Sequence, residues 1–222
     1  MNKILNRLLP LVILIPGVFL ALYWNRLPAE VPLHFDINGN PDRLGSKNEL
    51  LVMVITLSAA SLLVYLLVIN IYRIDPKKYA AENKLRLQRI GFSLAVFLSA
   101  LTCFIIYSVS RGGSRFDLNL VLSGVGLLFA VIGNYLPNLK PNYFAGMRLP
   151  WTLENPENWR KTHALAGKLW FAGGLLLAIS CIFLSAKAAM IFFFAVMLVL
   201  VLIPCVYSYR YYRQQKNNNP VQ

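Results

Sequence analysis

The sequence is poor in acidic residues: Asp and Glu together number 9, against 22 Lys and Arg. No acidic or basic side chain stands in the middle of the long apolar runs that fill most of the chain. Ion-coupled transporters and proton pumps usually keep ionisable groups at mid-membrane depth, because these groups carry the coupled ion. Their absence argues against a pump. It leaves open a carrier that uses backbone and hydroxyl groups.

Hydroxyl and small residues are the main interruptions of the apolar runs. Pairs of small residues with four-residue spacing, Gly126 with Ala130 and Gly174 with Ala178, predict close contact between helices. The hydroxyl groups are expected to form hydrogen bonds between helices rather than to line a transport path, and they belong to Thr56, Ser58, Ser61, Ser99 and Thr102.

Cysteine and histidine are also scarce, with three and two residues. Cys103, Cys181 and Cys205 stand in apolar runs without CxxC spacing, so we expect them to be packing residues. His34 and His163 lie far apart, and neither has a Cys, His or acid at ligand spacing. No Ser, Cys or Lys stands in a recognisable nucleophile motif. The sequence therefore predicts no metal site, no cofactor and no catalytic site.

Apolar residues are in large excess. They make up 57% of the 222 residues, whereas soluble domains average about 45–50%. They gather in runs that reach the length of about 17–25 residues needed to cross a membrane as a helix. The sequence therefore predicts an all-α membrane protein with six transmembrane helices, at about Leu8–Trp24, Leu50–Tyr72, Ile90–Tyr107, Leu118–Leu136, Leu169–Ala186 and Ala188–Tyr209.

The distribution of Lys and Arg among the loops indicates the orientation. The two termini, loop 2 (about residues 73–89) and loop 4 (about residues 137–168) together hold 16 of the 22 basic residues, and the other three loops hold six. Both termini are therefore expected to be cytoplasmic. No basic domain stands apart from the spans, so direct nucleic-acid binding is not expected, whereas anionic membrane lipids would be attracted. We divide the chain into three units. Residues 1–73 form a two-span unit with an outer loop, and residues 74–136 form a pair of spans with a basic loop. Residues 137–222 comprise the signature loop, two spans and a basic tail.

The first polar loop, residues 25–49, reads NRLPAEVPLHFDINGNPDRLGSKNE. Its early prolines predict an extended segment, and the Asn-Gly-Asn-Pro run predicts a turn. Ser46 with Glu49 three residues later has capping-box spacing. Oxygen-bearing side chains alternate from 36 to 42 as in a calcium loop, but Pro41 and Lys47 replace the required glycine and glutamate. We expect an ordered polar cap rather than a calcium site.

The fourth loop, residues 137–168, is the longest polar segment of the chain. Its prolines exclude a single helix, and Gly146 marks a turn. The pair Asn155-Pro156 indicates a helix start, from which a helix is expected to continue into the fifth span. Trp151 and Trp159 suit a membrane interface, where an aromatic ring is apolar and its polar tip stays wet.

Two interpretations of this loop remain open. It is either a brace that seals the inner face between the fourth and fifth spans, or a docking surface for a cytoplasmic partner. Exposed basic side chains favour docking, and Arg148, Arg160 and Lys161 are the ones we expect to be wet.

At these residues the chain resembles a known family. The stretch GNYLPNLKPNYFAGMRLPWTLENPENWRKTHALAGKLW closely resembles the signature of the SdpI family of bacterial immunity proteins. The stretch LPAEVPLHFDINGNPDRLGSK resembles the extracytoplasmic motif of a domain of unknown function at the start of such proteins, and RIDPKK after the second span is also similar. The resemblance covers nearly the whole chain, in the same order.

The resemblance also names candidate site residues in the two loops. In the outer loop, as a toxin-facing motif, they are Pro32, His34, Phe35, Gly39, Asp42, Gly45, Ser46 and Lys47. In the cytoplasmic signature they are Asn134, Pro137, Lys140, Pro141, Asn142, Tyr143, Gly146, Arg148, Pro150, Trp151, Thr152, Trp159, Lys161, Thr162, His163 and Gly167.

What the resemblance implies is a non-enzymatic role in the bacterial cell membrane. It implies protection of the cell from a secreted, membrane-active peptide toxin. It also implies a signalling receptor that holds a cytoplasmic autorepressor at the membrane. Two other classes stay open at this point: a small-solute or lipid transporter, and a membrane enzyme acting on lipid or peptide.

Overall fold

Six long helices dominate the computed structural model, which describes residues 2–36, 38–77, 80–111 and 116–218. Each is long and apolar enough to cross a membrane, so the six predicted spans are confirmed. Of the loop residues in the charge count, Lys78 and Arg115 lie outside the described residues. The long helices are α1 (Lys3–Tyr23), α2 (Lys47–Ile74), α3 (Lys84–Ser110), α4 (Leu118–Tyr135), α6 (Pro156–Phe183) and α7 (Ala186–Asn218).

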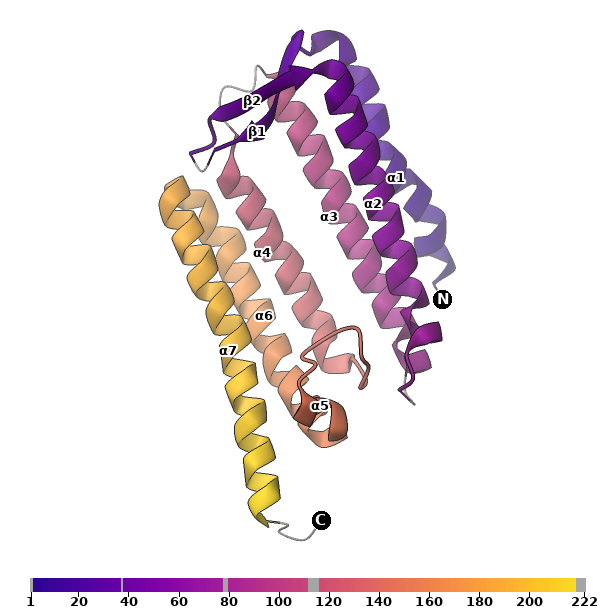
Figure 1. The fold of residues 1–222 in the computed structure, drawn as a ribbon, viewed down its shortest axis with the longest axis vertical. Coiled ribbons are helices and arrows are strands. Elements are labelled where there is room, and N and C mark those ends of the chain that lie inside the picture. Colours follow the sequence, from indigo (N-terminus) through magenta and orange to yellow (C-terminus); the bar gives the residue numbers. More distant parts are fainter. Residues whose placement is uncertain (1, 37, 78–79, 112–115, 219–222) are drawn as a thin grey trace.

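Successive long helices run in opposite directions, which gives the molecule two distinct ends (Figure 1). One end, called here the hairpin end, carries a short 3-10 turn, two strands that form a β-hairpin, and the turn between α6 and α7. These elements are η1 (Trp24–Arg26), β1 (Glu30–Phe35) and β2 (Pro41–Ser46). The signature end carries both termini and three short helical elements, η2 (Ala80–Asn83), η3 (Leu136–Asn138) and α5 (Pro150–Glu154).

The helices pack as two groups. Helices α1, α2 and α3 contact one another, and α4 packs most extensively against α6, which in turn packs against α7. The contact between α3 and α4 joins the two groups, called here the N-half and the C-half (Figure 1). The division into residues 1–73, 74–136 and 137–222 stays a prediction.

Small residues allow α4 and α6 to approach closely. A Cβ atom built on Gly126 would lie 2.7 Å from the backbone nitrogen of Ala178, and one on Gly174 would lie 2.6 Å from the carbonyl oxygen of Gly126. Real Cβ atoms essentially never approach backbone this closely. The predicted close contact at Gly126 and Gly174 is therefore confirmed.

Two prolines inside spans free a carbonyl group that another helix then satisfies. Pro16 has no N–H to donate to Val12, and the hydroxyl of Ser99 on α3 donates to the Val12 oxygen at 2.8 Å. Pro204 likewise leaves the Leu200 oxygen, which accepts from the indole nitrogen of Trp170 on α6 at 3.2 Å. Each freed carbonyl group is thus satisfied by a neighbouring helix of its own half.

The expectation that span hydroxyl groups bond between helices is confirmed for Ser99 alone among those with a bond described here. Thr56 and Thr102 instead donate within their own helices, to Val52 and Leu98. The hydroxyl of Ser61 is buried with no partner among the described residues. Hydroxyl position within a span therefore does not reveal which bonds reach a second helix.

The hairpin adds one small sheet to an otherwise helical chain. Strands β1 and β2 form a two-stranded antiparallel sheet, with Glu30 opposite Ser46 and Phe35 opposite Pro41. The sequence prediction placed an extended segment and a turn in this loop correctly but missed the second strand. The reason is that β2 reads PDRLGS and is mostly exposed, so it lacks the alternation of apolar and polar residues by which strands are recognised.

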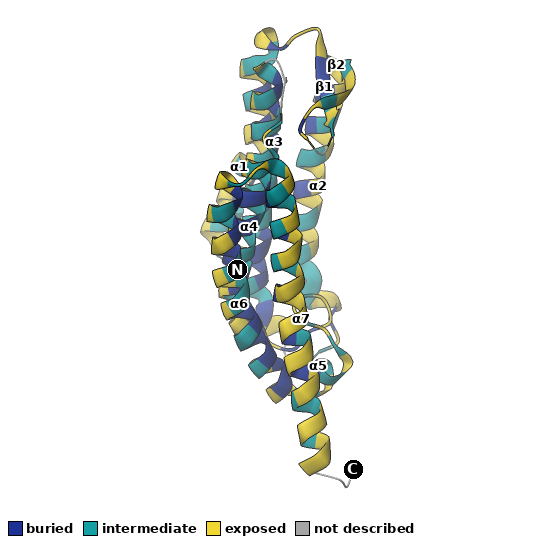
Figure 2. Cartoon of the chain, turned by 90° about the vertical axis from the view of Figure 1, so that its left-hand side faces the viewer, coloured by how far each residue is buried: buried dark blue, intermediate teal, exposed yellow. Residues whose placement is uncertain are grey.

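The outer faces of the long helices are apolar and exposed. Figure 2 shows exposed residues along α7, with buried ones where helices meet. Because a membrane solvates such faces, this distribution is that of a membrane protein. Among the predicted packing cysteines, Cys181 is in the core of the C-half, while Cys103 and Cys205 are only partly buried.

Candidate functional site

The turn at the tip of the hairpin is held by Asp36. Its carboxylate accepts hydrogen bonds from the backbone N–H groups of Asn40 and Asn38, each at 2.8 Å, and the Asn40 bond is the main cause that lowers the pKa of Asp36. Gly39 adopts a φ of 81°, and its oxygen accepts from the backbone of Phe116 at 2.8 Å. The predicted polar cap is confirmed.

His34 has an acidic partner that the sequence analysis missed. Its Nδ1 lies 2.6 Å from the Asp42 carboxylate, across the hairpin, and both side chains are exposed. The sequence analysis considered ligand spacing along the chain, whereas the two strands bring residues eight apart into contact. Within the described ranges no three His, Cys, Asp or Glu residues gather as they would around a metal ion.

The foot of the hairpin is fixed to α2 and to η1. Ser46 and Glu49 form the predicted capping box at the start of α2. Lys47 donates to the Trp24 oxygen at 3.2 Å, and Gly45 leaves no room for a side chain beside Leu33. Pro32 is buried opposite Leu44. The hairpin is therefore held rigidly over the ends of α1 and α2.

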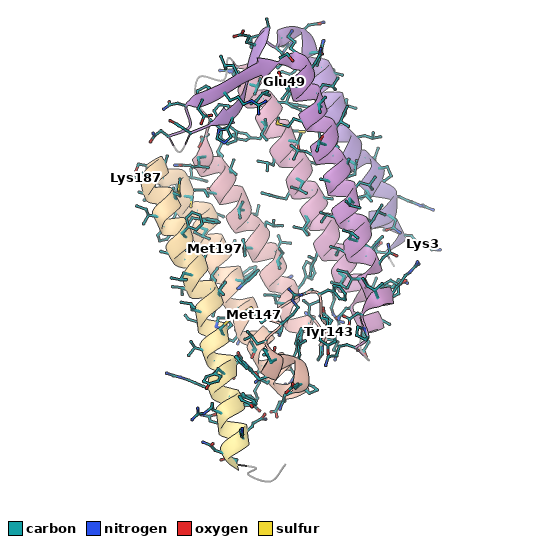
Figure 3. All side chains as sticks on the ribbon, viewed as in Figure 1. Lys3, Glu49, Tyr143, Met147, Lys187 and Met197 are labelled. Atoms are coloured by element: carbon teal, nitrogen blue, oxygen red, sulfur yellow. The ribbon has the colours of Figure 1, made fainter. Side chains whose placement is uncertain are left out.

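The hairpin also reaches the C-half. The ring of Phe35 stacks on that of Phe116, just before α4, with centroids 4.9 Å apart. A pocket of about 450 Å³ lies between the hairpin and α2, lined by Leu33, Arg43, Asn48, Glu49, Val52 and Met53. Figure 3 shows Glu49 at this end of the molecule. The outer-loop candidates thus gather at one end, against both halves.

The signature segment, residues 134–167, begins with a tight turn built on Asn142. The buried side chain of Asn142 accepts from the backbone of Phe144 and Ala145 and donates to the oxygens of Lys140 and Ala145. All its hydrogen-bonding capacity is used within the turn. Tyr143 and Phe144 are consequently held outward, at the edge of the segment, where Figure 3 shows Tyr143.

His163 and Trp159 form the buried centre of the segment. Their rings stack with centroids 4.0 Å apart, and both are almost fully buried. Met147 donates its backbone N–H to His163 Nε2 at 3.0 Å, so Nδ1 carries the proton and donates to the Trp159 oxygen at 2.8 Å. Gly146, with a φ of 104°, lies directly against the imidazole. The neutral imidazole is a structural link here.

Trp159 corrects the expectation of a wet interfacial anchor. It is 1% exposed, and its indole N–H donates to the Leu139 oxygen at 2.7 Å. Trp151 is partly buried, and its N–H donates to Ser208 on α7 at 3.0 Å. Both indoles therefore bond protein groups rather than water.

Buried polar side chains continue the network into α5 and α7. Thr152 donates to the Met147 oxygen and accepts from the Leu149 N–H. These bonds tie the short helix α5 to the residues just before Pro150. Asn158 donates to the Ser208 oxygen and accepts from Thr162. The signature segment is therefore joined to α7 by buried hydrogen bonds.

Three residues of loop 2 bind the same segment from the other half. The carboxylate of Asp75 accepts from the backbone of Tyr143 at 3.0 Å, and Lys77 donates to the Leu153 oxygen at 2.8 Å. Asn83 is fully buried and exchanges two hydrogen bonds with the backbone of Lys140, at 2.8 and 3.0 Å. The signature segment therefore links the N-half to the C-half.

These loop 2 residues were not predicted as site residues. Asp75 lies within the quoted RIDPKK motif, which could have directed attention to it. No sequence pattern marks Asn83, because its amide side chain pairs with the backbone of a distant residue, which can be of any type. Such a contact emerges from the fold alone.

The remaining candidates divide between surface and core. Pro141 and Gly167 are buried, whereas Asn134 and Pro137 are exposed. Of the three basic side chains expected to be wet, Arg148 and Arg160 are exposed. Lys161 is partly buried and lies 3.0 Å from Glu157 and 3.1 Å from the Tyr211 hydroxyl.

Comparison with known proteins gives two family matches and two relatives. Residues 138–208 match the SdpI/YfhL protein family, and residues 11–57 match a domain of unknown function, DUF1648. The chain is 25% identical over 194 residues, 87% of its length and 88% of the relative's, to "Immunity protein SdpI" of Bacillus subtilis (strain 168). It is also 35% identical over 66 residues, 30% of its length and 36% of the relative's, to an uncharacterised protein of Archaeoglobus fulgidus. No solved structure matches the chain.

These matches coincide with the structural sites described above. The signature segment from residue 138 onward lies in the first matched region, and the whole hairpin loop lies in the second. The similarity to the relative from Bacillus subtilis covers 87% of the chain, so it extends well beyond the two matched regions. The chain is a membrane protein that matches the SdpI/YfhL protein family over residues 138–208.

Proposed function

We propose that this chain protects its cell from a secreted, membrane-active peptide toxin. The observation that carries the proposal is the similarity over 87% of the chain to a protein named as an immunity protein. Protection by capture or blocking requires only a binding surface.

The hairpin end is the surface that we propose for the toxin. It is exposed, it carries the pocket beside Arg43 and Glu49, and its tip rests on Phe116 at the start of the C-half. A peptide bound there would touch both halves. Binding that favours one arrangement of the halves shifts the population toward that arrangement.

The orientation that this requires is a prediction with a direct test. Both termini lie at the signature end, where 16 of the 22 basic residues gather, so this end should be cytoplasmic. A phosphatase reporter fused after Gln222 should be inactive, and one inserted after Arg43 should be active. An active reporter at the C-terminus would contradict the orientation and move the toxin site to the wrong side.

Survival of toxin-treated cells tests the immunity role. A sensitive strain that expresses this chain should survive the peptide toxin that the Bacillus subtilis relative counteracts, whereas cells with an empty vector should die. Mass analysis of the recovered peptide should show it intact, because capture leaves its bonds unchanged. Toxin fragments that appear only with expressing cells would indicate an enzyme instead.

The finer part of the proposal is that the signature end holds a cytoplasmic autorepressor while toxin is bound. Exposed Arg148 and Arg160 support it, because within the described residues neither forms an ion pair with a carboxylate, while Arg148 donates to the Tyr143 oxygen at 2.6 Å. The same cells can carry a tagged repressor. It should sediment with membranes only in the presence of toxin, and the Arg148→Gln/Arg160→Gln variant should lose this sedimentation while survival is kept. Sedimentation unaffected by the variant would leave the segment as a brace.

A further inference from the structure

An apolar groove runs between the two halves on one side of the molecule. It has a volume of about 560 Å³ and is lined only by α3 and α4. Ser93 is the one polar side chain in its lining, and its hydroxyl already donates to the Arg89 oxygen at 3.0 Å. The groove therefore offers an occupant apolar contact and no free hydrogen-bonding group in its walls.

The length of the groove suits one leaflet of a membrane. On α3 it extends from Phe92 to Phe104, which is about 18 Å along the helix axis. The hydrocarbon core of a bilayer is about 30 Å thick, so the groove spans roughly half of it. Both walls belong to candidate membrane spans.

The two ends of the groove differ. Toward the hairpin end, the ring of Phe104 lies 5.3 Å from that of Phe116, which in turn stacks on Phe35. Aromatic rings therefore close this end. Toward the signature end, Arg86 and Arg89 precede Ser93 by seven and four residues, which places them on the groove face of α3.

Both arginines are available to an anion. Arg89 is exposed, and Arg86 donates to the backbone oxygen of Glu82 at 2.8 Å. Within the described part of the chain, neither guanidinium forms an ion pair with a carboxylate. A positive pair at one end and an apolar trough closed at the other match an amphiphile with a negatively charged head.

We propose that this groove binds an anionic phospholipid of the leaflet on the signature side. One acyl chain lies between α3 and α4 and points toward Phe104, and the phosphate lies against Arg86 and Arg89. A second copy of this chain would bring a like-charged pair to the same place, which opposes that alternative. The bound lipid fills the space between the halves and so supports their contact.

The first test is lipid retention by the intact purified protein in mild detergent, measured by native mass spectrometry. After lipid removal and addition of phosphatidylglycerol, the wild-type chain should retain one molecule and should bind phosphatidylcholine more weakly. The Arg86→Gln/Arg89→Gln variant should bind phosphatidylglycerol roughly tenfold more weakly, because two charges near the phosphate are lost. The matched control is Arg210→Gln/Arg213→Gln, which removes two exposed arginines of α7 at the same end.

The second test fills the groove itself. Ala100 is exposed in the groove wall, so Ala100→Phe should displace the retained lipid. Ala60→Phe adds the same ring to an exposed position of α2, outside the groove, and should change nothing. A photoreactive benzophenone side chain at position 100 should form lipid adducts in phosphatidylglycerol vesicles.

Three results would overturn the proposal. They are equal retention by the arginine pair variant and its control, equal binding of phosphatidylcholine and phosphatidylglycerol, and dimer or peptide adducts in place of lipid adducts at position 100. The survival assay of the proposed immunity role is independent of all three, so either proposal can fail alone.

Discussion

Replacing Gly174 by leucine will separate α4 from α6 and remove most of the folded protein. A side chain at Gly174 meets the backbone of Ala130 and lies 2.6 Å from the Gly126 oxygen. Backbone cannot rotate away as a side chain can, so the helices themselves must part. The cost should therefore exceed the ~1–3 kcal/mol of ordinary overpacking. The measurement is the yield and Tm of the monodisperse protein in detergent.

Gly17 provides the matched control for this change. It lies in the middle of α1, and a Cβ atom there meets nothing within 4 Å. Gly17→Leu should leave yield and Tm unchanged or slightly higher, since leucine favours a helix more than glycine does. If Gly174→Leu behaves like Gly17→Leu, the close contact of α4 with α6 is not what holds the C-half together.

Trp159→Ala should cause the second large loss. A fully buried tryptophan truncated to alanine costs about 3–5 kcal/mol through lost contacts and the cavity left behind. The change also leaves the Leu139 oxygen without its donor and removes the ring on which His163 stacks. We expect a sharply lower Tm and protease cleavage within residues 139–153, measured on the solubilised full chain.

Two further variants separate the causes. Trp159→Phe keeps an aromatic ring but loses the N–H, so its cost should be nearer the ~1–3 kcal/mol of one unsatisfied buried acceptor. Trp151→Ala removes a half-buried ring that contacts Tyr209 and Tyr212 on α7, so it should destabilise the protein less. A Tm for Trp159→Ala equal to that of Trp151→Ala would refute a central role for the buried ring.

The sequence predicts the membrane spans well because their signal is local. Each span carries its own apolar run, and Ser46, Asn155 and Pro156 mark two helix starts by chemistry that acts within one turn. The extension of α7 to Asn218 lies beyond the apolar run that predicts its span. Hydropathy measures what a membrane solvates and does not report where a helix ends.

The candidate site is less predictable because its contacts join distant parts of the chain. The signature segment is identified by its residues, but its role as a link depends on Asp75 and Asn83, more than 50 residues away. The His34–Asp42 pair needs the strand register, and the burial of Trp159 needs η3 above it. A tryptophan near an apolar run looks the same from sequence whether it faces lipid or the core.

The compensation of the two kinked spans has a consequence for how the chain is made. The Leu200 oxygen meets a partner, Trp170, that is 30 residues earlier and is therefore already synthesised when Pro204 emerges. The Val12 oxygen accepts from Ser99, which lies 87 residues later and is synthesised only afterwards. Helix α1 thus enters the membrane with an unsatisfied carbonyl group and completes its structure only after α3 has been inserted. In the C-half the donor is made before the proline. The N-half, although it is translated first, therefore completes its hydrogen bonds later.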